Sequence, residues 1–386
     1  MISLPGQKIA VIGTGTIGAQ ALWQLAKKNV DVTGYELYSP GHSRGAAGGE
    51  SRLFRHMEAE HIEYLPVTER ADTIWNELEM ESGRRLRNLT GALMIGSEAS
   101  PSTDNALSAA NSLGSTTEIL TRGEAQKRYP QYALNEDEIA ILDKGAGTIF
   151  PERTVKAAAD AAIGRGARIV RERRVEDIRQ EGDKVSIATD EETTLYDHAI
   201  VAAGAWTATL LPEMAQYLAT RRLLSGWFLP AAGRSIDGLL PYMRLDPNYS
   251  YGLPTADGLA MKLGVGFPHH LPVTSPDSAP MRIEDAEIEP VRAVARDLFP
   301  DLDDYPMRAQ AYFEAYTNTR REYMNFHPTM PSVFVCAGFS GKGFKNAPFF
   351  GELAADTILG RKPSIAEAQF ILDVEHVAKL PESRAE

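Results

Sequence analysis

Residues 8–36 read KIAVIGTGTIGAQALWQLAKKNVDVTGYE. The apolar run at 9–12 is typical of a buried parallel strand, and Gly13, Gly15 and Gly18 follow it with the spacing G-x-G-x-x-G. A helical pattern continues to residue 29, a second strand is expected at 30–35, and Glu36 stands directly after it. This order predicts the strand–helix–strand unit of a Rossmann-type dinucleotide-binding domain.

The residues of this motif have physical roles in such a unit. Gly13 allows the tight turn, Gly15 lets the backbone approach a pyrophosphate, and Gly18 lets the helix pack closely on the strand. The phosphates are expected at the positive end of the helix. Glu36 is placed to bind ribose hydroxyls and to repel a 2′-phosphate, which argues against NADP. An ordinary glycine turn would not explain why strand, helix and acid all agree, but the motif alone leaves NAD and FAD open.

Composition limits the class of protein. The chain has 386 residues, so two domains are expected. Its net charge is −12, from 40 basic and 52 acidic residues, which disfavours nucleic acid and anionic membranes as partners. The single cysteine excludes an intrachain disulfide and favours the cytoplasm. The first residues lack the features of a signal peptide, and no apolar run is long enough to span a bilayer.

The rest of the chain suggests a second architecture. Helices are expected at 122–128, 151–164 and 349–359, and short alternating strands at 223–230 and 242–263. The alternation predicts an antiparallel sheet, so the fold class is α/β in the first domain and α+β overall, with a second domain built on that sheet. No metal site is expected, because His269 and His270 have no completing ligands nearby, and we interpret them as loop histidines without a chemical role.

Three further segments lie where a ligand could be held. The loop at 37–56, LYSPGHSRGAAGGESRLFRH, ends in Ser51, Arg52, Arg55 and His56. On a helical turn Arg52 and Arg55 would face the same way, and the alternative is a solvated basic helix start. An apolar run at 195–203 enters Gly204-Ala205-Trp206, and another at 333–337 enters the glycine-rich turn GFSGKGFK at 338–345.

These motifs together resemble the monomeric sarcosine oxidase family of flavoenzymes, to which N-methyltryptophan oxidase and the fructosyl amino acid oxidases (amadoriases) belong. The resemblance runs from about residue 8 to residue 360 and is most specific in ESRLFRH and GFSGKGFK. It implies a Rossmann-type FAD-binding domain made of residues 1–85, 145–220 and 325–386. It implies a substrate domain made of residues 86–144 and 221–324.

The resemblance also implies roles for residues at matching positions. Arg55 and Lys345 would hold the substrate carboxylate, and Arg52 would lie beside the flavin. Lys262 would activate oxygen near the flavin, with Tyr251 and Tyr316 in the active site. The residues expected to bind FAD are Gly13, Gly15, Thr16, Ile17, Gly18, Glu36, Ser51, Arg52, Val175, Gly204, Trp206, Gly338, Gly341, Lys342, Gly343, Phe344 and Lys345.

The chain departs from the family pattern at three positions. Glu314 stands where the family has the cysteine that attaches FAD, so non-covalent FAD is expected; Cys336 is interpreted as a small buried residue. Gly48 and Gly266 replace two active-site histidines. We expect these two substrate-binding positions to leave more room, which favours a substrate bulkier than sarcosine.

The predicted function is an FAD-dependent oxidase of N-alkylated amino acids, leaning to fructosyl amino acids (Amadori compounds). The amine would be oxidised to an imine that water hydrolyses, and O2 would be reduced to H2O2. The alternatives are an N-methyl amino acid oxidase, an NAD-dependent dehydrogenase, and a dinucleotide-binding regulatory module without enzymatic activity. The expected partners are the small-molecule substrate and O2, with a monomer or small homo-oligomer.

Overall fold

The glycine motif joins β1 (Lys8–Ile12) to α1 (Thr16–Lys27), and β2 (Asp31–Tyr35) follows, as predicted. The computed structural model describes residues 6–58 and 62–371. Three segments of the predicted FAD-binding domain lie outside the described residues: 1–5, 59–61 and 372–386. The first of them includes most of the N-terminal segment that was predicted not to be a signal peptide.

β1 is central in a six-stranded sheet with the order β20-β21-β13-β1-β2-β9. The other strands are β9 (Arg168–Val170), β13 (His198–Val201), β20 (Tyr323–His327) and β21 (Met330–Ala337). All neighbours are parallel except the edge pair β20 and β21. The chain therefore returns twice to the first sheet, through the apolar runs before Gly204 and Gly338.

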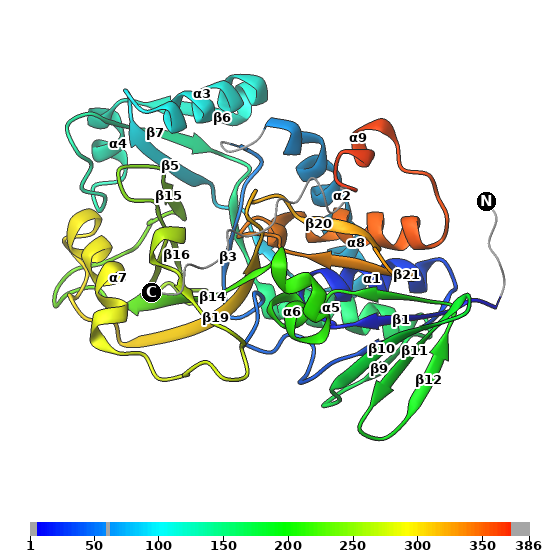
Figure 1. The fold of residues 1–386 in the computed structure, drawn as a ribbon. Helices are drawn as coiled ribbons and strands as arrows, with labels where there is room; N and C mark the ends of the chain where they lie inside the picture. Colours follow the sequence, from blue (N-terminus) through cyan, green and yellow to red (C-terminus); the bar gives the residue numbers. More distant parts are fainter. Residues whose placement is uncertain (1–5, 59–61, 372–386) are drawn as a thin grey trace.

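Alternate residues of β1 face two different layers. Ile9 and Val11 belong to a buried cluster with α1, α2 (Leu65–Ser82), α5 (Pro151–Gly164) and α8 (Gly343–Ile358). Ala10 and Ile12 belong to a second cluster with the antiparallel sheet of β10 (Val175–Glu181), β11 (Lys184–Thr189) and β12 (Thr193–Tyr196). Because successive side chains of a strand point to opposite faces, these apolar runs are buried on both sides. Figure 1 shows the layers at the right of the view.

The larger sheet forms the other half of the molecule, at the left of Figure 1. Its order is β18-β14-β17-β16-β15-β5-β7-β6, and β19 pairs with the free side of β14. The pairs are antiparallel, as predicted, except that β15 runs parallel to β5. Its strands are β5 (Ala92–Ser97), β6 (Thr117–Leu120), β7 (Glu138–Asp143), β14 (Ala219–Phe228), β15 (Tyr242–Arg244), β16 (Ser250–Pro254), β17 (Met261–Val265), β18 (Leu271–Pro272) and β19 (Arg308–Tyr316).

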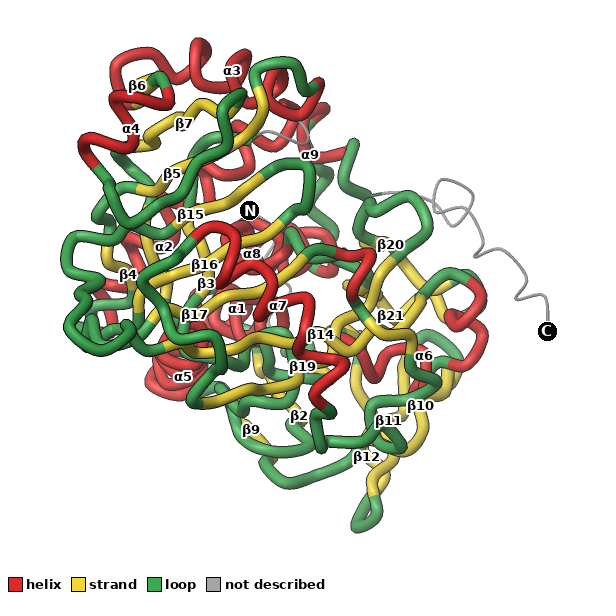
Figure 2. Tube along the Cα trace, turned by 90° about the vertical axis from the view of Figure 1, so that its left-hand side faces the viewer, coloured by secondary structure: helices red, strands yellow, loops and turns green. Residues whose placement is uncertain are grey.

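The two faces of this sheet differ in character. Leu224, Phe228 and Leu263 face a buried cluster that includes α7 (Asp285–Leu298), which lies over β14 and β17 in Figure 2. In the observed register Trp227 is opposite Lys262, and Arg221 is opposite Glu314, on the other face. One face is therefore core, and the other carries polar and charged side chains.

A small sheet corrects the expectation for the basic loop. Arg52 lies in β3 (Arg52–Phe54), which pairs with β8 (Gly147–Ile149), beside β4 (Arg87–Asn88). Arg52 and Arg55 are thus not on a helical turn. The remaining elements are η1 (Ile62–Tyr64), α3 (Pro101–Leu113), η2 (Gly114–Thr116), α4 (Arg122–Arg128), η3 (Gly204–Trp206), α6 (Thr207–Leu210), η4 (Pro212–Gln216), η5 (Phe267–His269) and α9 (Ile365–Ala368).

α4 and α5 have the predicted bounds, whereas α8 begins at Gly343 rather than at residue 349. Within the described part of the chain, no helix is both long enough and apolar enough to cross a bilayer. The predicted domain boundaries stay a prediction.

Candidate active site

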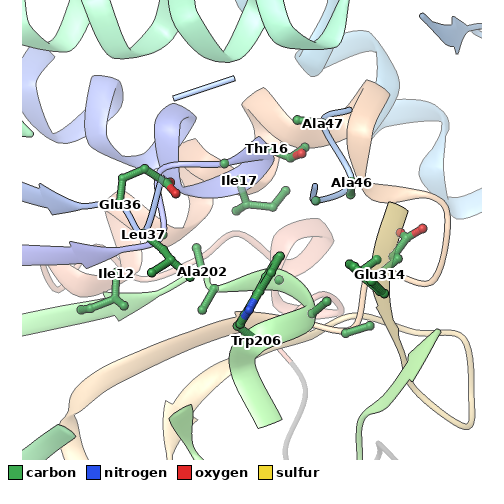
Figure 3. Close-up of a pocket in the computed structure, with 18 of the residues that line it drawn as sticks. Ile12, Thr16, Ile17, Glu36, Leu37, Ala46, Ala47, Ala202, Trp206 and Glu314 are labelled. Atoms are coloured by element: carbon green, nitrogen blue, oxygen red, sulfur yellow. The ribbon is translucent and has the colours of Figure 1, made fainter. Parts of the chain in front are cut away.

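A cavity of about 430 Å³ lies against the glycine motif and extends to the larger sheet. This is within the usual size of a small-molecule or cofactor site. Figure 3 shows Glu36 and Glu314 on opposite sides of the view with Trp206 between them. The predicted residues that line the cavity are Gly13, Gly15, Thr16, Ile17, Glu36, Arg52, Val175, Gly204, Trp206, Gly338, Gly341, Gly343 and Phe344.

The three motif glycines have the geometry that a dinucleotide site needs. A Cβ on Gly18 would lie 1.8 Å from the carbonyl oxygen of Gly13, so only glycine lets α1 approach β1 this closely. Gly13 has φ +85°, which favours glycine. A Cβ on Gly15 would meet no protein atom within 4 Å, although Gly15 lines the cavity. That open space at the start of α1 is where the backbone can approach a phosphate.

Glu36 is fixed at the cavity wall. Its Oε2 accepts hydrogen bonds from the backbone N–H of Thr14 (3.0 Å) and from the Thr14 hydroxyl (3.1 Å). Its Oε1 accepts from the N–H of Tyr38 at 3.0 Å. A carboxylate oxygen has about two acceptor positions, so Oε1 can still accept from a ribose hydroxyl.

Four residues expected to bind the cofactor do not line the cavity. Gly18 acts through the close contact just described. Ser51 is buried, and its carbonyl oxygen accepts a hydrogen bond from Lys262. Lys342 lies over the ring of Tyr64, with its Nζ 5.2 Å from the ring centre. Lys345 is buried on α8, outside the set of residues that line the cavity.

The polar face of the larger sheet meets the loop that follows β2. Lys262 is 1% exposed, and its Nζ donates to the carbonyl oxygens of Gly49 (2.9 Å) and Ser51 (3.0 Å). Burial, and then the nearby Arg52, hold the pKa of Lys262 well below its usual range. Arg52 lines the cavity, and its Cζ lies 5.4 Å from the ring centre of Tyr312. The predicted oxygen-activating lysine and flavin-side arginine are therefore neighbours.

Glu314 begins a chain of buried polar groups. It lines the cavity, and its Oε1 accepts from the N–H of Gly341 at 2.8 Å. Its Oε2 is 3.5 Å from the hydroxyl of Tyr316, which lies 3.1 Å from Nδ1 of His270. Nε2 of His270 is 3.0 Å from the carbonyl oxygen of Val265, so Nε2 carries the proton and Tyr316 donates to Nδ1.

Burial raises the pKa of the Glu314 carboxyl. It also lowers the pKa of His270 to about 4, so this histidine is neutral at physiological pH. The sequence interpretation of His270 as a loop residue without chemistry missed this contact, because nothing in the sequence pairs residue 270 with residue 316. Tyr251, the other predicted tyrosine, is in β16 on the same face of the sheet, and burial raises the pKa of its hydroxyl.

Arg55 and Lys345 lie close together, as predicted, but both contact a carboxylate of the protein itself, that of Glu58. Nη1 of Arg55 is 3.4 Å from Oε2 of Glu58, and Nζ of Lys345 contacts Oε1 of the same residue. Thr68 also donates to Oε1 of Glu58 at 2.7 Å. Burial, and then the nearby Arg55, hold the pKa of Lys345 well below its usual range, and none of Arg55, Lys345 and Glu58 lines the cavity. Glu58 is a residue that the sequence did not single out.

The expected extra room at Gly48 and Gly266 is not found. A Cβ on Gly48 would lie 2.2 Å from the carbonyl oxygen of Ser43. A Cβ on Gly266 would lie 2.9 Å from the ring of Tyr249. The space at both positions is filled by other protein atoms, so the argument for a bulkier substrate fails here.

Cys336 is buried at the cavity wall on β21. Burial raises the pKa of its thiol, which makes it a poor nucleophile. In residues 6–58 and 62–371, no group of three or more His, Cys, Asp or Glu side chains is placed to hold a metal ion.

Comparisons with known proteins show the family of this chain. A family model described as DAO, FAD dependent oxidoreductase, matches residues 8–357. The chain is 30% identical over 365 residues to a monomeric sarcosine oxidase of Streptomyces avermitilis, covering 92% of this chain and 94% of that protein. It is 26% identical over 376 residues to an N-methyl-L-tryptophan oxidase of Salmonella agona, covering 94% of this chain and 98% of that protein.

Solved structures share the fold. The open form of NikD, an amino acid oxidase, has a TM-score of 0.80 at 20% identity, covering 97% of this chain and 98% of that one. Amadoriase II of Aspergillus fumigatus has a TM-score of 0.77 at 19% identity, covering 95% and 89%.

The residues at the cavity fit FAD. The open backbone at Gly15, the start of α1 and the fixed Glu36 carboxylate are the groups that a dinucleotide needs. The far end of the cavity lies beside Arg52 and Glu314. With the family match over residues 8–357, this fit means that the chain belongs to the DAO family of FAD-dependent oxidoreductases and is an FAD-dependent amine oxidoreductase.

Proposed function

We propose that this protein oxidises N-alkylated amino acids, with N-methyl amino acids as the first candidates, and reduces O2 to H2O2. The observation that supports this most is the meeting of two surfaces: the dinucleotide cavity ends at the polar face of the larger sheet, where Lys262 and Arg52 are neighbours. Relatives named for sarcosine and N-methyl-L-tryptophan, at 26–30% identity, support an N-methyl substrate.

FAD, held at Gly15, the start of α1 and Glu36, would supply the redox chemistry for amine oxidation and O2 reduction. Residues of the protein would orient the amine and supply charge. Lys262, buried and fixed by two carbonyl oxygens, would hold a proton where negative charge develops on oxygen. Tyr316, whose hydroxyl proton is directed to His270, would present its oxygen lone pair to a donor in the site.

The substrate carboxylate would bind at the cluster of Arg55, Lys345 and Glu58. Both side chains contact the carboxylate of Glu58. An arginine fork and an ammonium both suit the α-carboxylate of a substrate. In a protein of net charge −12, a local positive group is needed to hold an anionic substrate.

A fructosyl substrate remains a prediction without the support that first favoured it. That preference rested on extra room at Gly48 and Gly266, where other protein atoms now lie. The shared fold with amadoriase II, at 19% identity, does not favour one N-substituent over another.

Non-covalent FAD also belongs to this proposal, because Glu314 is no nucleophile for a thioether and Cys336 is a buried thiol. Acid precipitation should leave the yellow colour in the supernatant. A cytoplasmic location and a monomer or small homo-oligomer stay predictions.

A peroxide-coupled assay tests the proposed activity. The purified protein with FAD would be offered N-methylglycine, N-methyl-L-tryptophan, other N-methyl amino acids and the matching N-fructosyl amino acids. The proposal expects peroxide from N-methyl substrates, with kcat/KM above that of the fructosyl compounds. Peroxide from fructosyl compounds alone would reject the N-methyl preference, and no peroxide from any secondary amine would reject the activity.

A further inference from the structure

Two guanidinium groups near the site have no carboxylate partner. The Cζ of Arg320 lies 3.7 Å, and that of Arg221 4.9 Å, from the ring centre of Phe267. Nη1 of Arg221 donates to the carbonyl oxygen of His270 at 3.2 Å, but its Nε is buried and lacks a hydrogen-bond partner within the described chain. Across residues 6–58 and 62–371, neither arginine forms an ion pair.

Two buried arginines of the larger sheet do have carboxylate partners. The next residue along β14, Arg222, points to the opposite face and pairs with Glu287 at 2.6 Å. Arg244 pairs with Glu138 at 2.6 Å. For Arg320, by contrast, burial lowers the pKa; Tyr316 and then Glu314 oppose this, while repulsion from Arg221 acts in the same direction as burial. Two like charges held together in a partly desolvated place are stabilised by an anion that binds between them.

The pair lies next to the end of the cavity. Arg221 on β14 is the cross-strand partner of Glu314 on β19, so their side chains are on the same face of the sheet. The Cζ of Arg320 is 5.6 Å from the ring centre of Tyr316, two residues beyond Glu314 on the same strand. Both arginines therefore lie near Glu314, at the end of the cavity, although neither lines the cavity itself.

The backbone at Arg320 also sets it apart. Its φ is 59°, in the left-handed region that residues other than glycine rarely adopt. Such conformations are found where the surrounding structure requires one particular side-chain direction, often at a binding site. Here that direction places the guanidinium over Phe267.

We propose that Arg221 and Arg320 form a second anion subsite, which binds a carboxylate of the substrate other than the one expected at Arg55 and Lys345. This inference rests on the proposed function and names its substrate class: an N-alkylated amino acid with a second carboxylate, in its side chain or in its N-substituent. Planar guanidinium forks suit the two oxygens of a carboxylate.

Binding to the FAD-loaded protein tests the subsite without turnover. Titrations would follow the visible flavin absorbance with butyrate and with the dicarboxylates from malonate to adipate. The wild type should bind the best dicarboxylate about ten- to a hundredfold more tightly than butyrate, since a charge-assisted hydrogen bond contributes about that factor. Arg320→Met should remove this difference and leave butyrate binding unchanged.

Two variants serve as controls. Arg321→Met removes a neighbouring positive charge that is already paired with Glu63 at 3.3 Å, so the dicarboxylate preference should persist. Arg320→Lys keeps the charge without the fork and should restore part of the preference. Equal binding of butyrate and every dicarboxylate in the wild type, or equal weakening of both by Arg320→Met, would overturn the subsite.

Turnover distinguishes the two sources of the second carboxylate. For a carboxylate in the side chain, the comparison is between N-methyl-L-glutamate and N-methyl-L-glutamine. For a carboxylate in the N-substituent, it is between N-(2-carboxyethyl)glycine and the compound whose carboxyethyl group is an amide. Arg320→Met should lower kcat/KM for the acid of the preferred pair about ten- to a hundredfold and leave its amide unchanged. If no secondary amine is oxidised but the dicarboxylate preference holds, the proposed function fails and the subsite stands. If N-methylglycine is oxidised and neither acid is favoured over its amide, the subsite fails and the proposed function stands.

Discussion

The charged side chains of the site differ in what holds them. Lys262 has only carbonyl oxygens as hydrogen-bond acceptors, whereas Arg55 and Lys345 share Glu58. Arg221 and Arg320 lie near Glu314 but form no ion pair within the described residues. These arrangements suggest different roles. A cation that is not paired with a carboxylate is available to an incoming anion, whereas the charge of a paired cation is already partly neutralised.

Lys262→Met should slow the reoxidation of reduced flavin by O2 by roughly a hundred- to a thousandfold, the cost of removing one preorganised electrostatic group. Flavin reduction by substrate should change much less. The two half-reactions would be measured separately by stopped flow. Equal slowing of both would reject the role in oxygen activation.

Arg55→Met and Lys345→Met should each raise the apparent Kd of N-methyl amino acids about ten- to a hundredfold, because each removes a charge-assisted hydrogen bond. FAD content should stay normal, since neither residue lines the cavity. The matched control is Arg84→Met, an exposed arginine paired with Asp160. An amine substrate without a carboxylate should be indifferent to all three changes; a loss for both kinds of substrate would mean that Arg55 and Lys345 are structural.

Glu314→Gln should change the pH dependence of stability. Burial raises the pKa of Glu314 above that of the unfolded chain, about 4.3. As pH rises from there through the raised value, the unfolded state loses its proton first, so the free energy of unfolding falls and then levels off. Glutamine removes this loss. Urea unfolding at saturating FAD would be compared from pH 4 to pH 9, and parallel curves for the two proteins would contradict the shift.

At the scale of elements, the sequence predicted what depends on local pattern. The apolar run and glycine spacing gave β1, α1 and β2, and Pro151 and Gly164 marked the ends of α5. Arg52 was expected on a helical turn because its strand partner, β8, is distant in sequence. The glycine-rich segment at 338–345 resembled a turn throughout, yet Gly343 already begins α8.

Most of the residues predicted to bind the cofactor do line the cavity, because local motifs mark them. The residues that sequence missed, among them His270, Glu58, Arg221 and Arg320, acquire their roles from contacts across the fold. Gly266 shows the limit of substitution arguments: a missing side chain suggests space, but Tyr249 fills it. Cross-strand register and tertiary packing decide such positions, and neither can be read from residue order.

Gly15→Ala and Gly18→Ala separate the two functions of the first turn, which are cofactor binding and the packing of α1 on β1. A methyl on Gly18 would overlap the Gly13 carbonyl at 1.8 Å, so both the stability of the FAD-free protein and FAD binding should be lost or strongly reduced. A methyl on Gly15 meets no protein atom within 4 Å and extends toward the cavity. It should leave thermal unfolding of the FAD-free protein within about 0.5 kcal/mol of wild type while weakening FAD binding at least tenfold. Equal FAD affinity of Gly15→Ala and wild type would place the cofactor elsewhere.

At the scale of the whole molecule, two sheets contribute different kinds of residues to one cavity. The parallel sheet supplies a glycine turn and a fixed acid, and the larger sheet supplies a face of charged and phenolic side chains. The overall charge of −12 is unfavourable for an anionic substrate, so the positive groups near the cavity must supply the attraction locally.

Anaerobic mixing of the FAD-loaded protein with N-methyl amino acids examines both halves of this arrangement at once. We expect the visible flavin absorbance to bleach on addition of substrate. Admitting O2 should restore it, with one equivalent of H2O2 formed for each flavin reoxidised. An absorbance that stays unchanged with every N-methyl amino acid, or bleached flavin that O2 does not restore, would contradict an amine oxidase of this class.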